Sequence, residues 1–72
     1  MYHGKVKWFD ETKGYGYIIR DDDGKEVFVH FTAIDMPGYR SLQKGQAVMF
    51  DCIEGEMGPL ATKVKFPAAQ PQ

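Results

Sequence analysis

The sequence predicts a small all-β domain: a five-stranded antiparallel sheet that closes into a barrel. Its 72 residues are enough for one domain with a small core. Short apolar or alternating runs are separated by turn-forming pairs such as Asp23-Gly24 and Lys44-Gly45. No segment has the period of an amphipathic helix that could cover a sheet, so the sheet is expected to close on itself.

The five strands are expected at residues 6–9, 15–20, 27–31, 47–53 and 60–66. Residues 32–34 should form a single helical turn where the third strand ends, followed by a long loop up to residue 46. The domain is therefore expected to cover residues 1–66. The tail at residues 67–72 has no apolar anchor and is expected to be disordered.

Composition excludes several classes of function. A net charge of -1 argues against a protein that binds duplex DNA by charge alone. One cysteine and two histidines cannot make an internal disulfide or a four-ligand metal site of thiolates and imidazoles. No motif places a nucleophile beside a base, and no phosphate-binding loop is present, so we expect no enzymatic activity, no catalytic residue, no metal and no cofactor.

The chain also lacks an apolar N-terminal stretch and any apolar run approaching the roughly 18 residues of a membrane span. We therefore expect a cytoplasmic protein without membrane contact. Basic residues outnumber acidic ones in residues 1–20, and the reverse holds in residues 21–35. The acids at 21–23 are most simply interpreted as a solvated loop, and Cys52, which alternates with Val48 and Phe50, as a small buried hydrophobe.

Alternation along the second and third strands separates two faces. One face carries Gly16, Ile18, Val27 and Val29. The other carries Tyr15, Tyr17, Phe28 and His30. Aromatic stripes in small β-proteins are commonly core, but both faces of two strands cannot be interior to one barrel. The β-branched side chains have no polar atom and are assigned to the core, so the rings should face solvent. Exposure of these rings is costly unless they contact a ligand.

The first strand needs an irregularity to fit this arrangement. Strict alternation would place Trp8 beside Val6 in the core. We expect instead a bulge near Trp8, with Val6 and Phe9 inward and Trp8 outward. Lys7 and Lys13 then lie beside the rings, and because unpaired bases stack on rings while lysine binds phosphate, the pattern predicts a protein that binds single-stranded nucleic acid.

Three segments closely resemble the bacterial cold-shock protein family: residues 4–9 (GKVKWF), 13–18 (KGYGYI) and 27–31 (VFVHF). The resemblance implies an OB-type five-stranded barrel that binds single-stranded RNA and DNA with low sequence selectivity, as an RNA chaperone or a regulator of transcription or translation. It implies stacking by Trp8, Tyr15, Tyr17, Phe28, His30, Phe31 and Tyr39. Together with Lys7 and Lys13, these residues are the predicted binding site.

Several positions depart from what is common in the family. Alternation alone would put Phe31 in the core, whereas the resemblance places it on the binding face at the end of its strand. Asp10 stands where the family commonly has Asn, and both tyrosines of the second strand stand where Phe is common. Met57 replaces a residue that is frequently basic or polar, so its loop is not included in the site.

The aromatic pattern has two other interpretations. An RNA-recognition-motif domain would need two helices behind the sheet, which this sequence does not predict. A small barrel that binds proline-rich peptides would explain the rings but not the lysines beside them. The expected partners are single-stranded RNA and single-stranded DNA, with no small-molecule substrate, and the expected state is a monomer.

Overall fold

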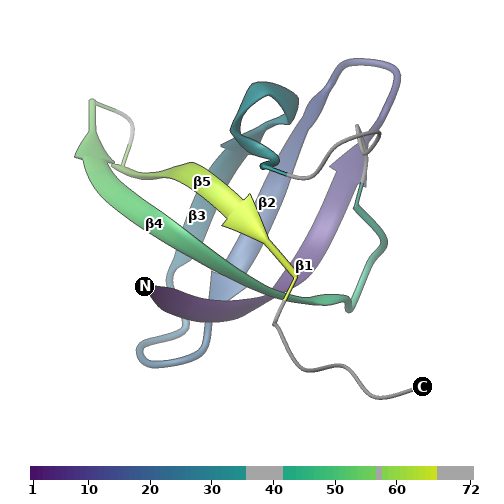
Figure 1. Ribbon diagram of the computed structural model, residues 1–72. Coiled ribbons are helices and arrows are strands. Elements are labelled where there is room, and N and C mark those ends of the chain that lie inside the picture. Colours follow the sequence, from purple (N-terminus) through teal and green to yellow (C-terminus); the bar gives the residue numbers. More distant parts are fainter. Residues whose placement is uncertain (36–41, 57, 67–72) are drawn as a thin grey trace.

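The computed structural model describes residues 1–35, 42–56 and 58–66. Within these residues the chain forms five strands and one short 3-10 helix (Figure 1). The elements are β1 (Tyr2–Asp10), β2 (Tyr15–Arg20), β3 (Glu26–His30), η1 (Phe31–Ala33), β4 (Ala47–Gly55) and β5 (Gly58–Lys65). No helix in this part of the chain is long and apolar enough to cross a membrane.

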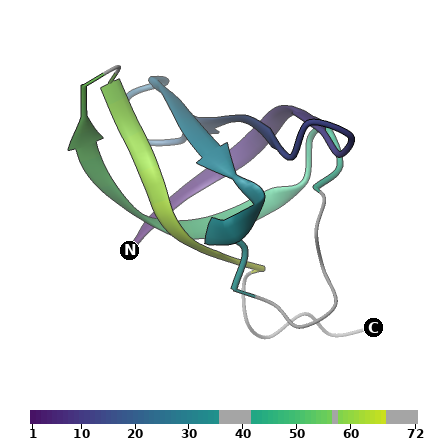
Figure 2. The same cartoon turned by 90° about the horizontal axis from the view of Figure 1, so that it is seen from above.

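The strands close into a barrel in the order β1-β2-β3-β5-β4, which confirms the predicted fold class. Seen from above, β5 lies between β3 and β4 and completes the wall (Figure 2). The β3–β5 junction differs from the others because it is parallel, with Phe28 opposite Leu60. All the other strand pairs are antiparallel, as the sequence predicted.

The predicted strands are all present, with differences at their ends. β1 begins earlier than predicted because its first half pairs with β4, which places Tyr2 opposite Phe50. β3 stops at His30, where the predicted helical turn begins one residue early as η1. The imidazole Nδ1 of His30 accepts a hydrogen bond from the backbone N–H of Thr32 at 3.3 Å, which caps this turn. The predicted tail, residues 67–72, lies outside the described residues.

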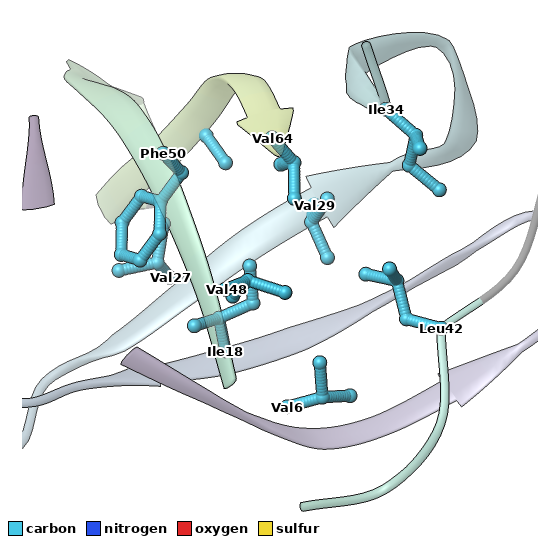
Figure 3. Packing of buried hydrophobic residues seen from close by; sticks show 10 residues of the cluster. Val6, Ile18, Val27, Val29, Ile34, Leu42, Val48, Phe50 and Val64 are labelled. Carbon is cyan, nitrogen blue, oxygen red and sulfur yellow. The ribbon is translucent and has the colours of Figure 1, made fainter. Parts of the chain in front are cut away.

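The core fills the interior of the barrel with aliphatic side chains and the ring of Phe50 (Figure 3). The fully buried side chains include Phe50, Ile18, Val27, Val29, Val48 and Val64. The inner face predicted for the second and third strands is therefore confirmed. Cys52 is only half-buried, although it continues the inward alternation of Val48 and Phe50 along β4 and packs against the core.

Gly16 allows β1 and β2 to approach closely beside Trp8. A Cβ atom on Gly16 would lie 2.2 Å from the carbonyl oxygen of Trp8 and 2.7 Å from Cα of Phe9. Any other residue would therefore push the two strands apart. This close approach lies on the inner side of the sheet, so it fixes the backbone from which Trp8 projects outward.

Candidate nucleic-acid interface

Four aromatic rings form a continuous cluster on the outside of β1, β2 and β3. Strand register places Tyr17 opposite both Trp8 and Phe28, so these three rings make a row across the sheet. Their neighbouring centroids are 5.5 Å apart in each case. Tyr15 lies 5.9 Å from Trp8 and 5.6 Å from Phe28, which joins it to the row. We call Trp8, Tyr15, Tyr17 and Phe28 the aromatic surface.

The bulge that orients Trp8 is present. The β1–β2 register shifts between Val6 and Trp8, so the alternation of side chains between the two faces of the sheet is reversed after the shift. Val6 is buried, Phe9 packs against the core, and Trp8 projects outward with 38% of its surface exposed. The indole is therefore accessible to a ligand.

His30 and Phe31 extend the aromatic surface to the end of β3. His30 lies opposite Tyr15, and its imidazole centroid is 4.7 Å from that of the Phe31 ring. Nδ1 of His30 is 2.9 Å from Oγ1 of Thr32, so Nε2 is the ring nitrogen that this contact leaves for a ligand.

Phe31 was expected in the core from alternation and on the binding face from the family resemblance, and its position combines both. Its half-buried ring packs partly against the core and also contacts His30. A Cβ atom on Gly14 would lie 2.8 Å from the Phe31 ring, so the glycine makes room for the ring at the β1–β2 loop. Tyr39, the remaining predicted stacking residue, lies outside the described residues.

The two predicted phosphate-binding lysines differ in their surroundings. Nζ of Lys7 is 2.6 Å from Oε2 of Glu26, so its charge is already compensated. Lys13 forms no ion pair with any residue in the described part of the chain. Its backbone N–H, like that of Thr12, donates to Oδ1 of Asp10, which gives this carboxylate a structural role in the turn that presents Lys13.

Arg20 corrects the interpretation of the acidic segment at residues 21–23. It is only 8% exposed, and its Nε donates to Oδ1 of Asp23 at 3.0 Å while Nη2 donates to Oδ2. Asp22 is 3.2 Å away, and the guanidinium lies 4.8 Å from the centre of the Tyr2 ring. The acids are therefore not simply a solvated loop, and Arg20 is not available to phosphate.

The Arg20–Asp23 contact also changes the protonation of both groups. The hydrogen bond from Arg20 holds the pKa of Asp23 well below its usual range, and the same bond raises the pKa of Arg20. Lys5 likewise pairs with Asp21 at 3.3 Å. Three of the basic residues in the first two strands are thus matched by acids, which leaves the rings as the dominant feature of this face.

Sequence reasoning missed a cavity of about 450 Å³ beside the aromatic surface. Tyr17, Glu26 and Phe28 line one side of it. The β4–β5 hairpin lines the other side with Gly55, Glu56, Gly58, Pro59 and Leu60. The cavity forms where the parallel β3–β5 junction brings the hairpin against the rings, and this non-local pairing had no signal in the local pattern.

A family model described as the 'Cold-shock' DNA-binding domain matches residues 2–67. The chain belongs to this family. The cold-shock-like protein of Thermotoga maritima is 55% identical over 62 residues, covering 86% of this chain and 92% of the relative. The corresponding protein of Aquifex aeolicus is 53% identical over 64 residues, covering 89% and 91%. Cold shock protein CspD of Bacillus subtilis is 53% identical over 64 residues, covering 89% and 96%.

These comparisons confirm the resemblance noted from the sequence and place the chain in a nucleic-acid-binding family. Within this cold-shock domain, the structure gathers Trp8, Tyr15, Tyr17, Phe28, His30 and Phe31 on adjoining strands and at the start of η1. Lys7 lies at the edge of the same face, against Glu26 of β3.

The ion pair between Lys7 and Glu26 gives a testable consequence. We expect Glu26→Gln to bind oligothymidine more tightly than the wild-type protein, because Lys7 no longer has to leave a carboxylate before it neutralises a phosphate. Affinities measured over a series of salt concentrations check this.

The matched control is Asp51→Asn. It removes the same charge from an exposed position on β4, where no ion pair is recorded among the described residues. If both variants raise affinity equally, overall charge and not release of Lys7 is responsible.

Proposed function

We propose that this cold-shock domain binds single-stranded RNA and DNA by stacking bases on the aromatic surface. One observation carries the proposal: three adjacent strands direct a connected set of rings outward, on the side opposite an aliphatic core. Base–aromatic stacking is worth about 1–3 kcal/mol per base and varies little with base identity, so such a surface binds strands with low sequence selectivity.

The ligand should be unpaired. In a duplex the base faces are stacked on one another, so the rings can reach them only in single strands or at ends and loops. In the proposed complex Lys13, and Lys7 when it leaves Glu26, bind phosphate beside the stacked bases. His30, Phe31 and Tyr39 continue the binding site beyond the aromatic surface.

This mode of binding suits an RNA chaperone or a regulator of transcription or translation. A protein that binds only the unpaired form of an RNA shifts the pairing equilibrium toward that form by mass action, and it needs no chemical step. We therefore propose a binding protein and not an enzyme, acting as a monomer in the cytoplasm.

Titration of Trp8 fluorescence tests the proposal, because Trp8 is the only tryptophan and lies within the aromatic surface. We expect quenching by oligothymidine or a single-stranded RNA of similar length, and little change with duplex DNA of the same sequence. A proline-rich peptide serves as the third ligand. Saturable binding of the peptide without binding of the single strands would replace this function with that of a peptide-binding barrel.

A further inference from the structure

The cavity beside the aromatic surface combines apolar walls with carboxylates. Tyr17, Phe28, Pro59 and Leu60 provide the apolar lining. Glu26 and Glu56 provide acceptor oxygens from opposite sides, one from β3 and one from the β4–β5 turn. A volume of about 450 Å³ falls within the range of small-ligand sites. Both glutamates are exposed residues.

The cavity is continuous with the proposed stacking surface because Tyr17 and Phe28 belong to both. A strand that stacks on these rings therefore brings a neighbouring nucleotide to the cavity. The two carboxylates repel phosphate, so the part of the nucleotide that enters should be the base and not the backbone. The apolar walls suit the faces of a base, and the glutamates can contact its edge.

The two glutamates differ in the partners they already have. Oε2 of Glu26 holds the ammonium of Lys7 at 2.6 Å. Glu56 forms no ion pair with another residue in the described ranges, so its carboxylate is the one available to a ligand. A carboxylate only accepts hydrogen bonds. Cytosine, adenine and guanine carry an exocyclic amino donor, whereas thymine and uracil carry none, and the single ring N–H of thymine and uracil lies between two carbonyl oxygens that repel a carboxylate.

We propose that this cavity is a base-selective subsite in which Glu56 accepts a hydrogen bond from the exocyclic amino group of cytosine, adenine or guanine. The subsite deepens the proposed function and rests on it. Stacking on the aromatic surface supplies affinity for any base, while Glu56 disfavours thymine and uracil at one position of the bound strand. Glu56 is thus a specificity-determining residue.

Oligodeoxycytidine and oligothymidine of equal length test the subsite, at neutral pH where cytosine carries no charge. The measured quantity is the ratio of the two affinities, which cancels any general effect of charge on phosphate binding. We expect Glu56→Gln to lower the cytosine-to-thymine ratio by about threefold to tenfold, because an amide both donates and accepts. Glu56→Lys should lower it further, since an ammonium donates to the thymine carbonyl and repels the amino group.

The matched control is Glu54→Gln, which removes the same charge from an exposed residue of β4 that does not line the cavity. It should leave the ratio unchanged. An oligomer of N4,N4-dimethylcytosine, which lacks the amino donors, should bind the wild-type protein less tightly than oligodeoxycytidine and show no such loss with Glu56→Gln.

An unchanged ratio in Glu56→Gln, or an equal fall in Glu54→Gln, overturns the subsite while binding of both oligomers leaves the proposed function intact. Absence of binding to either oligomer by the wild-type protein overturns both.

Discussion

Replacing Phe50 with alanine should lower the free energy of unfolding by about 3–5 kcal/mol. Phe50 is completely buried on β4 and carries the only ring among the fully buried side chains of the described residues. Its loss removes the largest side chain of the core, and a closed barrel cannot collapse readily around the resulting cavity. A small domain has a total stability of only about 5–15 kcal/mol, so the variant should be largely unfolded at moderate temperature.

Urea denaturation followed by circular dichroism measures this effect. Ile53→Ala on the same strand is the control, since Ile53 is 53% exposed and its truncation should cost far less. Similar losses of stability in the two variants would mean that the interior of the barrel is not the dominant core.

Replacing Phe28 with alanine should weaken binding to a pyrimidine-rich single strand by about 1–3 kcal/mol, which is roughly a fivefold to 150-fold loss of affinity. Phe28 lies between Tyr15 and Tyr17 in the aromatic surface and also lines the neighbouring cavity. Its removal therefore deletes a stacking ring at the centre of the proposed site. Fluorescence titration of the folded variant checks the prediction.

Val29→Ala is the natural counterpart, because Val29 is adjacent to Phe28 in sequence and fully buried on the opposite face of β3. It should lower stability by about 1–3 kcal/mol and leave the affinity of the folded fraction nearly unchanged. If Phe28→Ala unfolds the protein while its folded fraction binds normally, then Phe28 belongs to the core and the assignment of faces is inverted.

Local patterns in the sequence predicted most of the fold. Alternation along β2 and β3 separates buried valines from outward rings because side chains on a strand point alternately to its two faces. The bulge before Trp8 could be predicted because strict alternation from Val6 would have placed Trp8 in the core and Phe9 outside. The early start of β1 could not, since it depends on pairing with β4, more than forty residues along the chain. The same holds for the parallel junction between Phe28 and Leu60.

The sequence was less informative about charge. The excess of basic residues in residues 1–20 includes Arg20, but the turn after β2 folds Asp23 back onto the guanidinium of Arg20. Asp23 lies three residues after Arg20 and directly before Gly24, which has a positive φ, and this turn-forming sequence was a signal for the contact. The pairing of Lys7 with Glu26 had no local signal, because it joins β1 to β3 across β2.

The central claim is that stacking, and not charge, supplies most of the binding free energy. It is tested most directly by the salt dependence of oligothymidine affinity. Each phosphate neutralised on a single strand contributes about 0.7 to the slope of log affinity against log salt. Lys7 and Lys13 are the chief cations beside the rings, and the first of them is paired with Glu26. Two or three phosphate contacts predict a slope between about -1.4 and -2.1, with substantial binding remaining at high salt. A slope of about -5 or steeper would require about seven phosphate contacts and would contradict this account.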